Sequence, residues 1–343
     1  MICFTWWGLT QYAARAIQSF IQASGEDVIV VATRPSSPLK GMEEILSCPV
    51  IWVEENDLEV AKKLPAVPKI LFVNSWRLPC WTALGKVVRR NGGKIVATVD
   101  TNFSWGYKAF LRFVYFELVL RWRFDAYFVC GASGRRLMRS YLVSQRKIFE
   151  GLYGADKNLF HDGEALSGRQ KRIIYVGQFI VRKNVMRLVD AFEIFHKKYP
   201  DWQLLMCGHG PLHDQIKKTE GVEIRDFVQP TELAGLYRSS RAFILPSLEE
   251  HWGVVVHEAA LSGCYLLLSD RIGSAADFAG CNNARKFNPY SVEEIVSALS
   301  QMAELPDGDL SAAQAESCER GSRFGLNRFT ESAMQICKEL VMR

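Results

Sequence analysis

The chain has 343 residues, a hydrophobic fraction of 48%, a charged fraction of 23% and a formal net charge of +5. This length exceeds one typical core, so two domains are expected, and the composition excludes a disordered or fibrous protein. The mild positive charge is compatible with an anionic substrate or an anionic membrane surface. Lys and Arg do not form dense clusters interleaved with aromatic residues, so no nucleic-acid partner is expected.

The nine cysteines are an odd number and form no C-x-x-C motif. This pattern indicates buried, inert thiols in a reducing compartment. Residues 1–8 lack a basic stretch followed by a long apolar run, so no signal peptide is expected. No uncharged apolar window reaches about 18 residues, so no membrane-spanning helix is expected. A cytoplasmic protein is therefore predicted.

The first half of the chain alternates short apolar runs with helical patterns. Buried strands are predicted at 27–33, 50–53, 69–74, 94–99 and 126–130. Helices are predicted at 11–23, 58–64, 81–91 and 137–141. The strand runs are β-branched and bounded by turns, and their alternation with helices is typical of a parallel sheet covered on both faces.

The chain becomes polar and loses its periodicity at 162–172, where a linker is predicted. Strands are then predicted at 172–176, 203–207, 222–224, 242–245 and 265–269. Helices are predicted at 183–198, 212–218, 232–239, 254–262 and 329–341. The fold class is therefore α/β, and ligands of such folds bind beyond the carboxyl ends of the strands.

The segment 246–263 is the most informative part of the sequence. Glu250 and Glu258 are separated by seven residues, and a predicted helix start at Gly253 lies between them. The first N–H groups of a helix bind anions, and a carboxylate accepts hydrogen bonds from a vicinal diol. Glu258 lies in an apolar run, where a charged side chain needs a partner. The combination fits a nucleotide-sugar; a solvated surface helix after an ordinary turn is the alternative.

The second half resembles the nucleotide-sugar-binding domain of the retaining group-1 glycosyltransferases of the GT-B fold. The segments that carry this resemblance, in family order, are 176–184, 208–211, 222–227, 246–263 and 269–277. The resemblance implies two Rossmann-like domains that face each other across a cleft. Residues 1–165 would bind the acceptor, residues 166–325 would bind the donor, and a helix over 326–343 would pack back toward the first domain.

The two glutamates have roles that follow from the resemblance. Glu258 would hold the ribose hydroxyls, and Glu250 would reach the donor sugar as a catalytic residue. Glu249 competes with Glu250 on charge alone, but the seven-residue gap selects Glu250. The helix start between the glutamates adds four expected donor-binding residues, which are Trp252, Gly253, Val254 and Val255.

Cations near the donor diphosphate are expected in the segment that begins at Gly177. The family has an arginine directly after this glycine and a lysine five residues later; here Gln178 replaces the arginine and Lys183 matches the lysine. A preorganised cation stabilises the charge that grows on a leaving diphosphate. The resemblance implies that Lys183 binds donor and is catalytic, with Arg182 beside it, whereas Gln178 offers a hydrogen bond without charge. A solvated, basic helix start is the alternative for Lys183 and Arg182.

Two further segments of the resemblance add donor-binding residues. Gly208 and Gly210 follow a predicted strand, and their missing side chains would permit close approach to the ligand. Arg225 lies in the segment against which the family packs its nucleobase. A plain turn is the alternative for the glycines. The loop 270–275 is expected to shape the sugar pocket, with an ordinary strand-to-helix loop as its alternative.

The first half offers three residues for the acceptor side. Gly8 stands where the family has a glycine-rich loop after its first strand, and Asp100 and Asn102 follow the predicted strand 94–99. Many relatives carry a histidine here, and this sequence does not. Asp100 is the predicted acceptor-contacting and catalytic residue, with a loop cap as the equal alternative.

The segment 107–123 is aromatic, apolar and dotted with arginines. One interpretation is an interfacial helix that rests on the inner face of a membrane. The other is an ordinary core helix whose arginines extend to solvent.

The predicted function is transfer of a sugar from a UDP- or GDP-linked donor to a saccharide or lipid-linked saccharide, with retention of configuration. Polysaccharide or cell-envelope glycan synthesis is the expected setting. No separate cofactor is expected, and no metal, because His251 and His257 lack carboxylate and histidine neighbours at ligand spacing. The alternatives are a GT-B epimerase or phosphorylase and a weakly active nucleotide-sugar-binding subunit.

Overall fold

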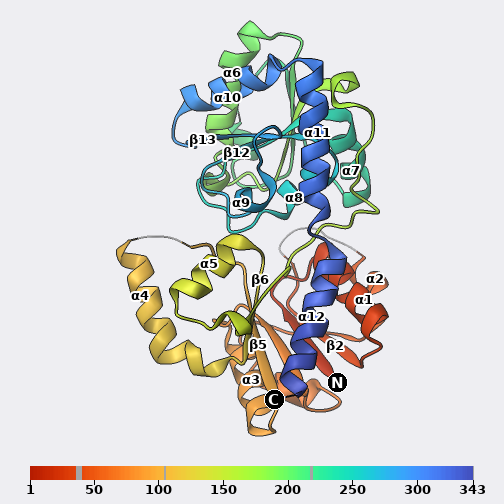
Figure 1. Cartoon of the computed structure of the whole chain (residues 1–343), viewed down its shortest axis with the longest axis vertical. Coiled ribbons are helices and arrows are strands. Elements are labelled where there is room, and N and C mark those ends of the chain that lie inside the picture. Colours follow the sequence, from red (N-terminus) through yellow and green to blue (C-terminus); the bar gives the residue numbers. More distant parts are fainter. Residues whose placement is uncertain (36–40, 104–105, 217–218, 343) are drawn as a thin grey trace. The chain divides into compact units, whose positions relative to one another are not determined.

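The computed structural model describes residues 1–35, 41–103, 106–216 and 219–342. The chain forms two compact units (Figure 1). Unit 1 comprises Met1–Gly154 and Phe324–Arg343, and unit 2 comprises Ala155–Arg323. Each unit has a sheet of its own and is described by itself.

Unit 1 is built on a parallel sheet in the order β3-β2-β1-β4-β5-β6-β7. Its strands are β1 (Ile2–Trp6), β2 (Val28–Ala32), β3 (Val50–Trp52), β4 (Ile70–Asn74), β5 (Lys94–Val99), β6 (Ala126–Val129) and β7 (Ile148–Glu150). Every residue of β1, β2, β4 and β6 is buried. Burial on both faces explains why these strands appear as continuous apolar runs rather than alternating ones.

The helices of unit 1 pack on this sheet. They are α1 (Gln11–Ser24), α2 (Met42–Ile45), α3 (Pro79–Arg90), α4 (Tyr107–Tyr115), α5 (Ala132–Ser140) and α12 (Leu326–Val341). Local residues determine where they begin and end. Helix α1 stops at Gly25, which adopts φ +64° and caps Ile21 O, and α3 begins with Pro79 at its first position.

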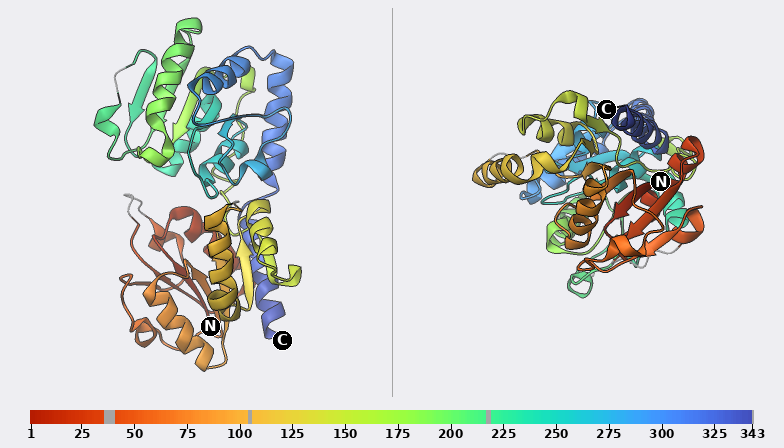
Figure 2. Two further views of the ribbon diagram at one scale, coloured as in Figure 1. Left: turned by 90° about the vertical axis from the view of Figure 1, so that its left-hand side faces the viewer. Right: turned by 90° about the horizontal axis from the view of Figure 1, so that it is seen from below.

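The last helix belongs to the core of unit 1. Phe329 of α12 lies 6.0 Å from the ring of Phe4 in β1 and 5.3 Å from that of Phe128 in β6. Helix α12 also packs against α1 and the edge strand β7, and Figures 1 and 2 show it alongside the sheet. Chain segments that are separated in sequence by the whole of unit 2 therefore share one hydrophobic core.

Unit 2 has a parallel sheet in the order β10-β9-β8-β11-β12-β13. Its strands are β8 (Gln170–Val176), β9 (Gln203–Cys207), β10 (Val222–Arg225), β11 (Ser240–Leu245), β12 (Tyr265–Ser269) and β13 (Ala284–Phe287). Its helices are α6 (Val185–Lys198), α7 (Pro230–Ser239), α8 (Val254–Leu261), α9 (Ala275–Phe278), α10 (Val292–Ala303) and α11 (Asp307–Ser322). Both units thus confirm the predicted α/β class.

Several predicted helices differ from the structure. The segment 58–64 contains a 3₁₀ turn at Val60–Lys63, and 212–218 contains one at His213–Gln215, while residues 217–218 lie outside the described part. The helix expected to start at residue 183 starts at Val185, after a 3₁₀ turn whose end, Asn184, has φ +58°. Short 3₁₀ turns carry helical sequence patterns without the length that an α-helix needs.

The boundary between the units lies before the polar stretch at 162–172. The backbone N–H of Ala155 donates to His257 Nδ1 at 2.9 Å, and the ring of Phe160 lies 6.0 Å from that of Tyr237. Leu166 is fully buried. Unit 2 therefore begins at Ala155, whereas the sequence pattern predicts the change at 165/166.

The segment 107–123 contains three types of helix in succession. Helix α4 ends at Tyr115 and is followed by a π-helical turn, Phe116–Leu120, and a 3₁₀ turn, Arg121–Arg123. Within the described residues, no helix has both the length and the apolar character needed to cross a membrane.

Candidate functional site

The expected donor-binding residues lie in loops at one edge of the unit 2 sheet. These loops follow β8, β9, β11 and β12, whose carboxyl ends meet at the same edge because all strands of the sheet are parallel. The sequence therefore brings four distant segments to one place. Figure 1 shows α8 and α9 at the ends of these strands.

Lys183 and Glu250 form a buried ion pair at this edge. The Lys183 ammonium contacts Glu250 Oε2, and the two residues are only 8% and 9% exposed. Arg182 Nη1 lies 3.7 Å from the same oxygen and donates to the carbonyl of Glu249 at 2.7 Å. Two cations thus converge on one carboxylate, which leaves a local excess of positive charge for an anionic ligand.

The backbone of Glu250 is held by the loop that follows β12. Glu250 forms a bridge with Ile272, and its carbonyl accepts a hydrogen bond from Gly273 N at 3.0 Å. The Glu250 N–H donates to Arg271 O at 3.3 Å. The loop 270–275 therefore positions the glutamate rather than only joining a strand to a helix.

Gly253 turns the chain into α8. It has φ +78°, and a Cβ at this position would lie 3.1 Å from Glu250 Cγ. A side chain would therefore meet both an unfavourable backbone conformation and a crowded neighbour. Val254 and Val255 are partly exposed, and their N–H groups belong to the first turn of the helix, where the dipole is positive.

Trp252, directly before Gly253, packs its side chain into the core of unit 2. Its side chain is 3% exposed and packs edge-on against Phe278, with 5.6 Å between the ring centroids. Trp252 therefore anchors the helix start in the core of unit 2.

Glu258, in the second turn of α8, faces Tyr237 of α7. The Tyr237 hydroxyl donates to Glu258 Oε2 at 3.3 Å. Burial raises the pKa of Glu258 from 4.5 to about 7, although the hydrogen bond from Tyr237 opposes the shift. The glutamate keeps part of its surface exposed. A carboxyl group with a perturbed pKa beside a helix start is typical of a functional site.

His257, next to this glutamate, is a structural residue. Its Nδ1 accepts from Ala155 N at 2.9 Å and its Nε2–H donates to Gly321 O at 2.9 Å, while its ring stacks on Phe278. Burial lowers its pKa from 6.5 to about 4, so the ring is neutral. His257 therefore joins the first and last segments of unit 2 to α8.

The loops that contain Gly177, Gly208 and Gly210 pack against each other. A Cβ on Gly208 would lie 1.9 Å from the carbonyl oxygen of Gly177, and one on Gly210 would lie 2.6 Å from that of Phe179. Hydrogen bonds from Gly177 N to Cys207 O and from Phe179 N to His209 O, both at 3.0 Å, join the loops. Backbone packing thus already requires glycine at 208 and 210.

Gln178 and Arg225 have local partners. The carbonyl of Gln178 accepts a hydrogen bond from the Tyr175 hydroxyl at 3.0 Å, and its side chain is exposed. The Arg225 guanidinium donates to Glu223 at 2.7 Å and lies 3.6 Å from Glu232. These contacts hold Arg225 at the end of the edge strand β10.

A group of side chains able to ligate a metal comes from the segments that follow β9 and β10. His209, His213 and Asp226 place ligand atoms within 4.8 Å of one another. Asp226 Oδ1 lies 3.0 Å from His209 Nδ1 and 4.0 Å from His213 Nε2, and the other nitrogen of His213 contacts Asp214 at 3.0 Å. This group was not predicted, although the four-residue spacing of the two histidines is visible in the sequence. His209 and Asp226 are exposed.

The expected acceptor-side residues lie at the carboxyl edge of the unit 1 sheet. Gly8 follows β1 with φ +62° and donates to Thr33 Oγ1 at 2.8 Å. Asp100 follows β5 and accepts from the Tyr153 hydroxyl at 3.3 Å. Asn102 is partly exposed two residues later. Asn74, at the end of the intervening β4, was not predicted; its side chain accepts from Trp7 N at 3.0 Å.

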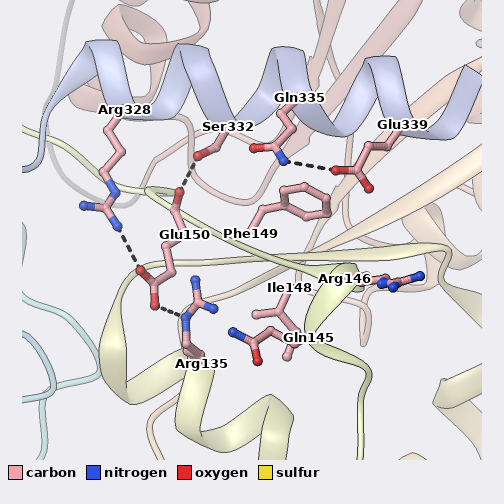
Figure 3. Close-up of a pocket in the computed structure, with 10 residues that line it drawn as sticks. All are labelled: Arg135, Gln145, Arg146, Ile148, Phe149, Glu150, Arg328, Ser332, Gln335 and Glu339. Carbon is pink, nitrogen blue, oxygen red and sulfur yellow. Dashed lines mark hydrogen bonds and ion pairs between the residues drawn. The ribbon is translucent and has the colours of Figure 1, made fainter.

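A cavity of about 480 Å³ in unit 1 lies between β7 and α12 (Figure 3). Glu150 accepts from Arg135 and, at 2.8 Å, from Arg328, while its carbonyl accepts from Ser332 at 2.6 Å. Both arginines therefore already have an acidic partner. The cluster fastens α12 to the edge strand.

The segment 107–123 exposes one apolar face. The exposed side chains, between 47% and 81% accessible, are Tyr107, Phe110, Leu111, Tyr115, Leu118 and Trp122. Apart from the adjacent Phe110 and Leu111, they are three to four residues apart, which places them along one side of the helical segment. The opposite side, with Phe116 and Leu120, is buried in the core of unit 1.

Comparison with known proteins identifies related sequences. Residues 156–320 match the family model for glycosyl transferases group 1. An uncharacterized glycosyltransferase of Haemophilus influenzae is 32% identical over 98 residues, which are 27% of this chain and 28% of that protein. Sulfoquinovosyl transferase SQD2 of Arabidopsis thaliana is 30% identical over 134 residues, which are 37% of this chain and 25% of that protein. The matched segments thus span less than a third of these curated relatives.

Solved structures match the whole chain. Sucrose-phosphate synthase of Thermosynechococcus elongatus superposes with a TM-score of 0.77 at 16% identity, covering 100% of both chains. A glycosyltransferase of Rickettsia africae gives 0.75 at 15% identity, covering 99% of this chain and 98% of that one. An Anabaena protein in complex with UDP and glucose gives 0.74 at 13% identity, covering 100% of both chains. The fold, two Rossmann-like α/β units, is GT-B.

Proposed function

We propose that this chain, a GT-B protein whose residues 156–320 match the group-1 glycosyltransferases, transfers a sugar from a nucleotide-sugar to an acceptor. The observation that carries the proposal is the pair of acidic residues on either side of Gly253. Glu250 is paired with Lys183, and Glu258 has a pKa raised to about 7. The cations and the helix start are suited to the diphosphate of such a donor, and the two carboxylates can accept hydrogen bonds from its sugar hydroxyls.

The donor would bind with its diphosphate at Lys183, Arg182 and the first turn of α8. The ribose hydroxyls would donate to the Glu258 carboxylate, and the sugar would lie near Glu250. When the phosphate binds, it competes with Glu250 for the Lys183 ammonium. The cation is then already in place where negative charge grows as the glycosyl bond breaks. UDP-linked sugars are the first donors to test, because UDP is bound in the similar Anabaena structure.

The reaction proposed is transfer with retention of configuration and without a metal. Lys183 and Arg182 supply the positive charge that a metal would otherwise supply at the diphosphate. The departing phosphate would take the acceptor proton, so no protein nucleophile is needed. Asp100, at the carboxyl edge of unit 1, would contact the acceptor.

The acceptor proposed is a saccharide or a lipid-linked saccharide, in polysaccharide or cell-envelope glycan synthesis. The exposed apolar face of 107–123 supports this choice because a row of aromatic and aliphatic side chains is typical of a peripheral membrane helix. The protein would then work in the cytoplasm, at the inner face of the membrane.

The test is a donor panel in which release of free nucleoside diphosphate is measured with and without acceptor saccharides. We expect one nucleotide-sugar to release nucleoside diphosphate faster with its acceptor, and a product anomeric configuration, read by NMR coupling constants, that matches the donor's. Folded Glu258→Gln should lose donor affinity, while the matched control Glu249→Gln, which changes an exposed neighbour, should keep it.

The same panel separates the alternatives. A GT-B epimerase would convert the donor without any acceptor. A nucleotide-sugar-binding subunit would bind the donor in calorimetry but release no nucleoside diphosphate under any condition. Either result would replace the proposed transfer.

A further inference from the structure

A groove in unit 1 runs along α3 and is separate from the expected donor and acceptor residues. Its volume is about 350 Å³. Its walls are apolar and are formed mainly by Trp76, Trp81, Ile95 and Phe124. Helix α3 supplies most of one wall over its 12 residues, a length of roughly 18 Å.

The groove contains a buried hydrogen-bond donor without a partner. Trp81 is 1% exposed, and its indole Nε1 has no hydrogen-bond acceptor among the described residues. Such a group is uncommon in a folded protein because an unsatisfied N–H loses its water without compensation. A ligand oxygen in the groove would satisfy it after a shift of neighbouring side chains, because the nitrogen itself is buried.

The rim of the groove is positively charged. Arg89 is paired with Asp125 at 2.9 Å. In the part of the chain that the structure describes, no carboxylate lies within ion-pair distance of Lys86, Arg90 or Arg123, which also line the groove and are exposed. An apolar interior with an uncompensated cationic rim is complementary to an amphiphile with an anionic head.

The groove is continuous with the exposed apolar face of 107–123. Trp122, which is 81% exposed, ends that face and also lines the groove. A molecule that leaves a membrane surface beneath this face would therefore meet the groove directly.

We propose that the groove binds one acyl chain of an anionic glycerophospholipid. The chain lies along the apolar walls, the ester carbonyl accepts from Trp81 Nε1, and the phosphate contacts Lys86 and Arg90. Lys86 follows Trp81 by five residues, roughly 7.5 Å along the helix axis, and both residues line the groove. The groove thus recognises both the acyl chain and the negative charge of the lipid.

The test uses full-length protein and short-chain lipids that form no bilayer at the concentrations used. Calorimetry is run with dioctanoyl phosphatidylglycerol, with dioctanoyl phosphatidylcholine and with glycerol 3-phosphate. We expect saturable one-to-one binding of the phosphatidylglycerol, at least tenfold weaker binding of the phosphatidylcholine, and no competition by glycerol 3-phosphate. Full competition by glycerol 3-phosphate, or only unsaturable uptake of lipid, would overturn the proposal.

Two variants locate the binding in the groove. Gly85→Leu fills it, whereas the control Gly85→Ala adds one methyl at an ordinary 3.5 Å from Ile95 Cδ1; only the leucine should abolish binding. Trp81→Phe removes the N–H but keeps a ring, and should weaken binding about fivefold to tenfold. Unchanged affinity in both Gly85→Leu and Trp81→Phe contradicts the proposal.

Two further measurements separate this inference from the proposals above. Leu118→Ser on the exposed face should weaken pelleting with phosphatidylglycerol vesicles and leave short-chain binding unchanged; a parallel loss of short-chain binding would place the lipid on that face instead. Nucleotide-sugar binding belongs to unit 2, so it should be the same in Gly85→Leu and wild type. Loss of lipid binding should therefore leave donor binding unchanged, and loss of donor binding should leave lipid binding unchanged.

Discussion

The Tyr237 hydroxyl lies 3.3 Å from Glu258 Oε2 and is in position to donate to it. The hydrogen bond favours the ionised glutamate, but burial favours the protonated form more strongly, and the pKa of Glu258 is raised to about 7. In the free protein at neutral pH, the carboxyl group therefore divides between its two protonation states.

This balance predicts that donor binding releases protons. The ribose hydroxyls would donate to the carboxylate, which favours the ionised form and lowers the pKa of Glu258 in the complex. At pH 7 roughly half a proton should leave per donor bound. Calorimetry in buffers of different ionisation enthalpy measures this number as a slope. Glu258→Gln should abolish the release and Glu249→Gln should preserve it. A slope of zero in wild type would show that Glu258 does not accept from the donor in its ionised form.

Tyr237→Phe provides a second prediction at the same contact. Removing the hydroxyl removes a hydrogen bond that lowers the pKa of Glu258. The pKa should rise further, so the midpoint of the pH dependence of donor affinity should move upward. Measuring affinity at several pH values between about 6 and 8.5, which bracket the usual range of such a shifted carboxyl group, tests this. An unchanged or lower midpoint would contradict the contact.

The ion pair between Lys183 and Glu250 predicts strong coupling in stability. Both residues are buried, and removing one charge leaves the other without its main partner. Lys183→Met should cost about 3 kcal/mol in the free energy of unfolding, and Lys183→Met with Glu250→Gln should cost much less than the sum of the single changes. Urea unfolding of wild type, Lys183→Met, Glu250→Gln and the double variant measures the coupling. Additive costs would mean that the pair does not form in solution, and Lys197→Met serves as an exposed control.

How far the sequence predicts the molecule depends on the range of each interaction. The buried strands β4, β5, β9 and β12 were predicted to within a residue because long β-branched or leucine runs are local signals. Strands β1, β7 and β13 were not predicted. Strands β7 and β13 are short and lie among charged residues, so they lack a continuous apolar run. Helices α2, α9, α10 and α11 were not predicted either.

Prediction of the site is limited in the same way, because its contacts join residues that are far apart in the sequence. The motif order predicted that Lys183 and Glu250 serve one ligand, but their direct pairing depends on loops 67 residues apart. The sequence places Trp252 beside the helix start at Gly253, but the packing of its side chain on Phe278 has no local signal. The contact of Tyr237 with Glu258 has no local signal, since it depends on how α7 and α8 pack.

Neighbouring residues in α8 predict opposite pH effects on stability. Burial lowers the pKa of His257 to about 4, so its contribution to stability is present above pH 6.5 and is lost as the pH falls toward 4. The raised pKa of Glu258 has the reverse effect: the folded state gains stability as the pH falls from 7 to 4.5. Wild type should therefore vary little between about pH 5 and 6.5, where the two effects oppose each other. In Glu258→Gln the melting temperature should fall on acidification through this window. His257→Asn should be less stable at neutral pH but should gain stability on acidification, and equal slopes in the two variants would contradict both shifts.

The last prediction concerns Gly253. Its φ is +78°, and a Cβ added at this position would lie 3.1 Å from Glu250 Cγ, so Gly253→Ala must distort the start of α8 or displace the glutamate. We expect a loss of about 1–2 kcal/mol in the free energy of unfolding. Donor affinity should fall more than tenfold, because the first-turn N–H groups and Glu250 would both move. The control is Gly308→Ala in α11, where nothing lies within 4 Å of the added methyl and φ is not in the left-handed range; this change should be neutral or stabilising. If Gly253→Ala bound donor as well as Gly308→Ala, the helix start would not be part of the donor site.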